Sequence, residues 1–329
     1  MPEGATKAPP GSSDVASGPP GAPGEIRALV LMATFDGGAF LERQLDTLAA
    51  QTVPRIDVLA SDDGSRDATP AILARRAALW SKGSFTIRSG PASGFAENFR
   101  SLIAAAGDDA THVFFCDQDD EWDADKMAVA IRGLDAAGDR PALYFGRTRS
   151  IDEAGAPLGA SPLFRRPPSF RNAVVQSIGG GNTIALNADG FALLRESARR
   201  TGFVSHDWWS YMIVTGAGGK VIYDPVPRMG YRQHGANVVG SNRGARAGFT
   251  RLRRLFEGRF AGWTDRNLDG LTACRDLLSP EAAALVDELA LARRAGPVRC
   301  ALALGRLGIH RQTALSSIAL YSAALLSRV

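Results

Sequence analysis

The chain of 329 residues has little cysteine and no long uncharged apolar run. Its three cysteines, Cys116, Cys274 and Cys300, lie far apart without metal-ligand spacing, so we expect reduced thiols and no disulfide framework. No uncharged apolar run reaches the roughly 18 residues that a membrane-spanning helix needs. The first 25 residues hold six prolines and five glycines and lack the apolar core of a signal peptide. These absences predict a cytoplasmic protein with a disordered tail at residues 1–25.

The basic residues are unevenly distributed, although the net charge is only +4. Residues 241–260 carry six arginines against one acid, interleaved with five large apolar side chains. This pattern suits an anionic membrane surface, and it equally suits a solvated helix face over a local apolar core. Residues 313–327 are uncharged and predict either a core helix or an interfacial anchor. No nucleic-acid-binding motif accompanies the arginines, so we expect no nucleic-acid partner.

Short apolar runs alternate with segments of helical period in the first half of the chain. The runs predicted as strands are residues 26–33, 56–60, 85–88 and 112–116. Such alternation predicts an α/β fold with a mostly parallel sheet covered by helices on both faces. After residues 142–145 the alternation ends, and residues 241–329 are expected to form a basic, helical C-terminal extension to a domain at residues 26–240.

An acidic run follows the fourth predicted strand. Asp117, Asp119 and Asp120 occupy three of four positions after a buried apolar segment. That much charge at the end of a buried strand needs compensation. Mg²⁺ or Mn²⁺ shared with a phosphate ligand would supply it, whereas the alternative is a solvated turn before an acidic helix start. Polar clusters also follow the first two strands, at residues 34–36 and 61–67, and ligands bind at this edge of parallel sheets. The three clusters together favour a site.

Four further positions are candidates, each with a structural alternative. Asp63 could accept a hydrogen bond from a nucleobase or a ribose, or could serve only the turn. Asn98, one turn into the helix after Gly94, could present its amide to a ligand or be an ordinary surface residue. Arg232 could neutralise a diphosphate, and His234 could be a metal ligand.

Asp207 is the candidate general base. It is followed by Trp208 and Trp209, whose rings could desolvate the carboxylate and stack on a sugar. The alternative is a helix N-cap at Asp207 with both tryptophans in the core.

These motifs, taken in order, resemble the inverting family 2 glycosyltransferases of GT-A fold, and are most similar to bacterial rhamnosyltransferase-like members. The matching segments are residues 33–37, 51–52, 61–67, 117–122, 206–209 and 231–237. They extend over residues 27–240, and the set is far more specific than any one segment. Two positions depart from the family pattern, because Asp36 and Phe35 stand where Asn and Tyr are common.

The resemblance implies a nucleotide-sugar site. Asp117 and Asp119 would be the DxD motif that holds Mg²⁺ or Mn²⁺ with the donor diphosphate. Asp63 would contact the pyrimidine, while Thr34 and Asp36 would line the same nucleotide pocket. The donors that it suggests include dTDP-rhamnose.

The resemblance also implies the roles of the later motifs. Asp207 would be the catalytic base, and His234 would reach the metal or the diphosphate. The turn at residues 179–183 would help to shape the acceptor side. The implied acceptor is a saccharide or lipid-linked saccharide at the cytoplasmic face of the membrane, as in surface-polysaccharide synthesis.

Two other functions compete with this interpretation. A sugar nucleotidyltransferase would normally carry a cationic glycine-rich loop after the first strand, whereas residues 34–39 hold two glycines and no cation. A catalytically silent nucleotide-sugar or glycolipid-binding module would have lost the acidic pair or the base, and this chain has both. A dinucleotide-binding dehydrogenase is disfavoured because no GxGxxG follows residues 26–33.

Overall fold

The computed structural model describes residues 26–235 and 259–329. The proline- and glycine-rich tail at 1–25 lies outside these residues, as does most of the basic segment predicted at 241–260. What the sequence predicts for those segments therefore stays a prediction.

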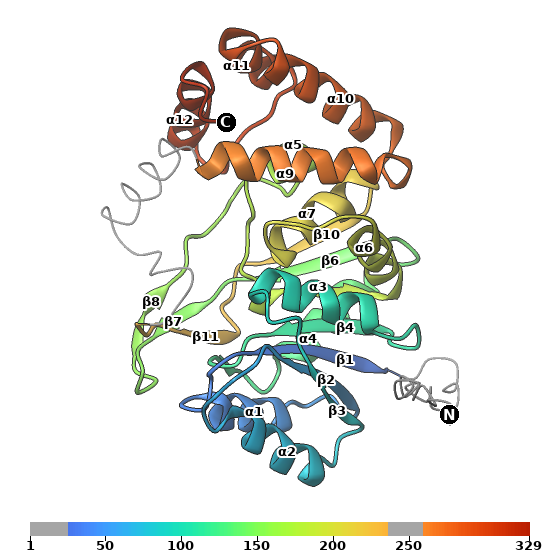
Figure 1. Cartoon of the computed structure of the whole chain (residues 1–329), viewed down its shortest axis with the longest axis vertical. Helices are drawn as coiled ribbons and strands as arrows, with labels where there is room; N and C mark the ends of the chain where they lie inside the picture. Colours follow the sequence, from blue (N-terminus) through green and yellow to red (C-terminus); the bar gives the residue numbers. More distant parts are fainter. Residues whose placement is uncertain (1–25, 236–258) are drawn as a thin grey trace, which may run out of the picture.

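A seven-stranded sheet forms the centre of the molecule (Figure 1). Its order is β10-β6-β9-β4-β1-β2-β3, and every strand except β9 runs in one direction. The strands are β1 (Ala28–Thr34), β2 (Ile56–Asp62), β3 (Phe85–Ser89), β4 (His112–Cys116), β6 (Ala142–Gly146), β9 (Ala185–Asn187) and β10 (Lys220–Asp224). The predicted mostly parallel sheet is confirmed.

Both faces of the sheet are buried, as its continuous apolar strands require. In β1, Leu31 belongs to one hydrophobic cluster, whereas Val30 and Met32 belong to the cluster on the opposite face. The second face packs against α1 (Leu41–Ala49), α2 (Thr69–Leu79) and α4 (Lys126–Asp135). The first face packs against α3 (Phe95–Ala105), α6 (Ala188–Arg200) and α7 (His206–Gly216).

A second, four-stranded sheet lies beside the carboxyl ends of the parallel strands and has the order β5-β11-β7-β8. It consists of β5 (Glu121–Trp122), β7 (Arg149–Ile151), β8 (Pro157–Ala160) and β11 (Met229–Arg232). Because β9 runs against its neighbours, the short helix η1 (Gly181–Thr183) before it reaches this same edge. The edge thus gathers the acidic run, η1 and β11.

The described part of the C-terminal extension is helical, as predicted. It contains α9 (Arg259–Ala273), η2 (Arg275–Leu277), α10 (Pro280–Arg294), α11 (Pro297–Arg306) and α12 (Ala314–Leu325), while the short α5 (Phe170–Ala173) lies beneath α9 (Figure 1). Leu271, Leu289 and Leu320 share one hydrophobic cluster with Leu31 of the sheet. The extension therefore completes the core on that face. In the described ranges, no helix has the length and apolar character to cross a bilayer.

Candidate active site

The loops after β1 and β2 are joined by side-chain hydrogen bonds. The Thr34 hydroxyl donates to the Asp62 carboxylate over 2.9 Å, which fixes the two strand ends together. The backbone N–H of Asp36 donates to the Ser65 hydroxyl, and the Asp36 carboxylate accepts from the N–H of Arg66, each over 2.8 Å. Asp36 holds a left-handed φ of 46°, which aspartate tolerates better than most residues. Two of the three polar clusters are therefore a single unit.

Gln118 connects this unit to the acidic run after β4. Its amide makes two 2.8 Å hydrogen bonds to the backbone of Phe35, accepting from the N–H and donating to the carbonyl. Gly37 permits this approach, because a Cβ there would lie 2.2 Å from the Gln118 Oε1 atom. All three polar clusters predicted at strand ends thus converge at one edge of the sheet.

Asp63 and Asn98 lie beneath the loop between β3 and α3, and both are buried. The Asp63 carboxylate accepts from the backbone N–H groups of Ala92 over 2.7 Å and Gly94 over 2.9 Å. The Asn98 amide donates to the carbonyl of Ser61 over 3.0 Å. These contacts order the rim of the predicted nucleotide pocket. Each carboxylate oxygen keeps a second lone pair with which a base could pair.

The acidic run contacts His234, which follows β11. The Nε2 atom of His234 lies 2.6 Å from a carboxylate oxygen of Asp119. Burial, reinforced by the negative charges of Asp119 and Asp207, raises the pKa of Asp117 to about 7. The negative charges of Asp119 and Asp207 therefore act on Asp117, and the positive charge of Lys126 offsets part of their effect on its pKa.

The donor set fits a divalent cation that is completed by its substrate. Among residues 26–235 and 259–329 there is no ready-made cluster of three metal-binding side chains. Mg²⁺ and Mn²⁺, however, commonly bind one or two carboxylates and take the remaining oxygens from phosphate and water. Asp117 and Asp119 offer such a pair at the end of β4, and His234 lies in contact with the second.

Asp120, the third acid of the run, is fully buried and has a structural role. Its carboxylate accepts from the Asn182 amide over 2.5 Å and from the backbone N–H of Arg232 over 3.2 Å. It therefore ties β4 to η1 and β11. The buried cation Lys126 lies nearby with its Nζ 3.4 Å from the centroid of the Trp122 ring, and burial lowers its pKa to about 7.

Replacing Asp120 by alanine should destabilise the fold. Asn182 and the backbone N–H of Arg232 would lose their hydrogen-bond acceptor, and removing one member of a buried polar or charged pair costs about 3 kcal/mol. We expect a fall of that size in the free energy of unfolding, measured by urea denaturation. Asp139→Ala, at an exposed position, should change it by less than about 0.5 kcal/mol. Equal stability of the two variants would contradict this role.

Asp207 lies in the first turn of α7 and faces the acidic run. The helix N-cap is Ser205, so the alternative in which Asp207 caps the helix is wrong. The Ser177 hydroxyl lies 3.0 Å from one Asp207 carboxylate oxygen and 3.0 Å from the Gly179 carbonyl, so its single proton can be donated to either acceptor. The negative charge of Asp207 contributes to the raised pKa of Asp117, so the two carboxylates lie within electrostatic range of each other.

Residues 29–202 match the sequence profile of the family described as Glycosyl transferase family 2. This chain belongs to glycosyltransferase family 2. The matched range contains the strand-end clusters and the acidic run, and it ends before Asp207 and His234. The predicted family and enzyme class are confirmed.

Individual family members and related structures agree with this assignment. The dTDP-rhamnosyl transferase RfbG of Shigella flexneri is 26% identical over 235 residues, which cover 67% of this chain and 78% of that protein. The structure of S. aureus TarS 1-349 in complex with UDP-GlcNAc has a TM-score of 0.52 at 14% identity and covers 92% of this chain and 90% of its own. GalNAc-T7 with UDP, GalNAc and Mn²⁺ has a TM-score of 0.50 at 15% identity, covering 65% and 45% respectively. These structures confirm the GT-A fold.

Two predictions about side chains of the candidate active site differ from the positions that these side chains have in the structure. Trp208 and Trp209 are buried in the core, where their indole N–H groups donate to the Ala173 carbonyl and the Ser197 hydroxyl. They therefore cannot stack on a sugar, and that interpretation is wrong. Arg232 is also buried.

The guanidinium of Arg232 is used within the protein. It donates to the carbonyls of Asp119, Asp152 and Glu153, and to the carboxylate of Glu121 over 2.6 Å. These bonds hold β11 against the acidic run. They favour a supporting role for Arg232 over the predicted contact with the diphosphate.

The His206 side chain lies between the sheet and the candidate active site. Its ring centroid lies 3.9 Å from that of Phe99 and 4.9 Å from that of Phe115. Burial, partly offset by the negative charge of Asp207, lowers the pKa of His206 to about 4. Gly181 of η1 must be glycine here, because a Cβ would lie 2.0 Å from the Nε2 atom of the ring.

The low pKa of His206 predicts a loss of stability in acid. At pH values between the ordinary pKa of 6.5 and about 4, His206 is protonated in the unfolded chain and neutral in the folded chain. The free energy of unfolding therefore falls as the pH falls through this window. The shift corresponds to about 3 kcal/mol. We expect the stability difference between wild type and His206→Gln, from urea denaturation, to shrink by this order from pH 7 to pH 4. A constant difference would contradict a neutral, buried His206.

Three contributors to the site were not predicted from the sequence. Gln118 and Lys126 lie in or just after the acidic run, and their closeness to its carboxylates was a usable signal. Ser177 had no such signal, because it lies in an irregular segment 30 positions from Asp207.

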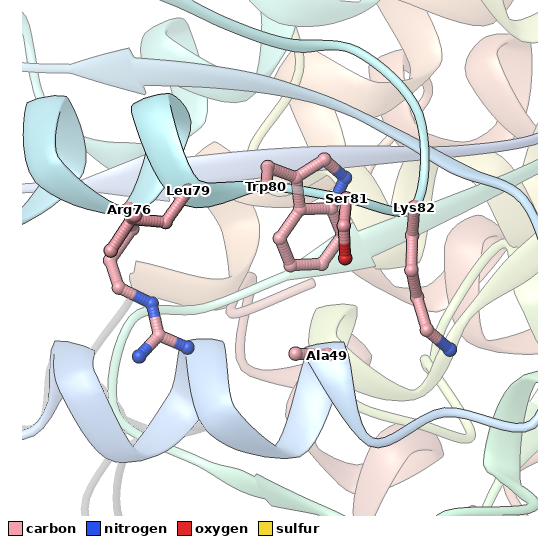
Figure 2. A pocket seen from close by; sticks show the side chains of 6 residues that line it. All are labelled: Ala49, Arg76, Leu79, Trp80, Ser81 and Lys82. Atoms are coloured by element: carbon pink, nitrogen blue, oxygen red, sulfur yellow. The ribbon is translucent and has the colours of Figure 1, made fainter.

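A separate hollow lies at the opposite edge of the sheet, between the ends of α1 and α2 (Figure 2). It is lined by Ala49, Arg76, Leu79, Trp80, Ser81 and Lys82. The Lys82 ammonium donates across it to the Val53 carbonyl over 3.1 Å. None of the candidate active-site residues lines this hollow.

Proposed function

We propose that this family 2 enzyme depends on Mg²⁺ or Mn²⁺ and transfers a sugar, with inversion, from a nucleotide-diphosphate donor to an acceptor hydroxyl. The observation that carries the proposal is the placement of Asp207 beside the pair Asp117 and Asp119. The segment before β9 supports this placement, because its Ser177 contacts the Asp207 carboxylate and its Asn182 contacts Asp120 of the acidic run. The charges of Asp119 and Asp207 also add to the effect of burial in raising the pKa of Asp117. A base close to a diphosphate site is the arrangement that a single displacement requires.

Asp117 and Asp119 would hold the cation together with the donor diphosphate, and His234 would support Asp119 or join the metal. When bound, the cation would offset the negative charge that grows on the departing diphosphate. His234 would act through the 2.6 Å contact of its Nε2 atom with Asp119. Asp120 and Lys126 would keep the end of β4 in place below them.

Asp207 would take the proton from the acceptor hydroxyl. The acceptor oxygen then bonds to the anomeric carbon as the bond to the diphosphate oxygen breaks on the opposite face, so the configuration inverts and no covalent enzyme intermediate forms. The 3.0 Å hydrogen bond from Ser177 would orient the carboxylate for this step.

Thr34, Asp36, Asp63 and Asn98 would form or support the nucleotide pocket. The similarity to an enzyme named as a dTDP-rhamnosyl transferase supports dTDP-rhamnose as the donor. The acceptor would be a saccharide or lipid-linked saccharide in surface-polysaccharide synthesis. All three cysteines are free and buried, which agrees with a reaction in the cytoplasm.

The test of this proposal is a donor panel. Calorimetry with Mn²⁺ would compare dTDP-rhamnose, UDP-GlcNAc and GDP-mannose, together with the free nucleotides. We expect dTDP-rhamnose to bind at least about tenfold more tightly than the others, a difference of about 1.4 kcal/mol. Equal or tighter binding of another nucleotide sugar would reject the rhamnose assignment and keep the enzyme class. No binding of any nucleotide sugar would reject the proposed function.

A further inference from the structure

The solvent side of α12 is apolar, although solvent-facing helix surfaces are normally polar. The helix has no charged residue, and one of its sides packs into the core through Leu320. Leu315, Ile318 and Leu325 recur at helical spacing on the opposite side, where they are 78%, 60% and 52% exposed. The sequence left a core helix and an interfacial anchor open for this segment, and the structure gives it one buried side and one exposed apolar side.

α11 packs against α12 and also has exposed apolar side chains (Figure 1). Val298 and Leu302 lie one turn apart on the outer side of α11 and are 60% and 68% exposed. Arg299 and Arg306 share this side of the helix, since they lie three and four positions from Leu302. We call these exposed residues the outer face: Val298, Arg299, Leu302 and Arg306 of α11, and Leu315, Ile318 and Leu325 of α12.

The segment of chain that carries the outer face has charges of one sign. Residues 289–329 contain neither aspartate nor glutamate, but they contain the six arginines Arg293, Arg294, Arg299, Arg306, Arg311 and Arg328. Two of these pair with acids of preceding helices, Arg293 with Asp265 and Arg306 with Glu288. Arg294, Arg299 and Arg328 are exposed. The end of the chain thus presents aliphatic side chains bordered by unbalanced positive charge.

We propose that the outer face is a docking surface for an anionic lipid membrane. Scattered single leucines need no partner, but a grouped apolar helix face with a basic border matches helices that lie in the headgroup region. The aliphatic side chains enter the acyl boundary, while the arginines attract anionic headgroups. A second copy of this chain fits less well, because a self-complementary contact would bring the arginines of both copies together.

Vesicle sedimentation with the full chain tests the proposal. Vesicles of phosphatidylcholine, with and without phosphatidylglycerol, would be mixed with wild type and with the double variant Leu315→Ser/Ile318→Ser. We expect wild type to bind the anionic vesicles and the double variant to bind them at least about tenfold more weakly. Arg299→Gln/Arg328→Gln should also lose about tenfold, and only on anionic vesicles.

Leu79→Ser is the matched control, because Leu79 is 73% exposed at the end of α2 and lies away from the outer face. This variant should bind the vesicles as wild type does. All variants should have the same Tm as wild type, because the substituted side chains are exposed. The proposal is overturned if wild type binds no vesicles, or if the Leu315→Ser/Ile318→Ser variant binds as wild type does. It is also overturned if wild type self-associates in light scattering and this variant does not, since the outer face would then join two copies. Because binding is the readout, failure of the proposed donor or metal would not change these outcomes.

Discussion

Asp207→Asn should lower kcat for sugar transfer by about 1000-fold, within the range that a positioned general base contributes. Asparagine keeps the shape of the side chain and can still accept the hydrogen bond from Ser177, so only the proton acceptor is lost. Donor affinity should stay within about twofold of wild type, because the proposed donor contacts lie elsewhere. Calorimetry for binding and a product assay for turnover separate these two effects.

Asp189→Asn is the matched control for the base. Asp189 also lies in the first turn of a helix, α6, so both substitutions remove a carboxylate from a helix N-terminus. Asp189 is exposed and belongs to none of the candidate active-site elements, and its variant should turn over as wild type does. Near-normal transfer by Asp207→Asn would show that another group accepts the proton.

Asp119→Asn should reduce metal-dependent turnover by about 1000-fold. Lewis-acid stabilisation is worth several kcal/mol, and the variant would lose one of two carboxylate ligands. Mn²⁺ affinity in the presence of the nucleoside diphosphate, measured by calorimetry, should fall by at least about 100-fold. The amide can still bond to His234, so the fold around β11 should remain.

The control for the metal is Asp109→Asn, since Asp109 lies at the opposite end of β4 and pairs with Arg27. That variant should bind Mn²⁺ and nucleotide normally. Unchanged Mn²⁺ affinity in Asp119→Asn would place the metal on other residues.

The sheet and its functional edge could be predicted because their signals are local. β1, β2 and β4 are apolar runs that end in polar residues, and the carboxyl ends of parallel strands share one edge. The convergence of Thr34, Asp36 and Asp117 follows from that rule alone. Gln118 then supplies the bonds that join the clusters.

The small sheet could not be predicted, because its strands have only two to four residues. A period of two cannot be recognised over so few positions. The position of the small sheet nevertheless decides which side chains surround Asp119. The buried Arg232 lies at the end of β11, and His234 follows that strand. The tryptophans beside Asp207 were ambiguous for a related reason, because a sequence does not show which side of a mostly apolar helix faces the core.

The acidic run divides into two functions. Asp117 and Asp119 line the candidate active site, whereas Asp120 turns inward to Asn182 and the Arg232 backbone. One buried carboxylate thus connects the sheet, η1 and the small sheet beneath the proposed metal. The third acid in the run is explained by this structural connection.

The central claim is that the acidic edge performs metal-dependent transfer from a nucleotide sugar, and release of nucleoside diphosphate tests it most directly. Purified protein would be incubated with dTDP-rhamnose in Mn²⁺, in EDTA, and in EDTA followed by excess Mn²⁺, with dTDP followed by chromatography. We predict slow release in Mn²⁺, none in EDTA, recovery on restoring Mn²⁺, and none from Asp119→Asn under any condition. Release that is equal in EDTA and Mn²⁺, or formation of dTTP on adding pyrophosphate in place of dTDP release, would contradict the account.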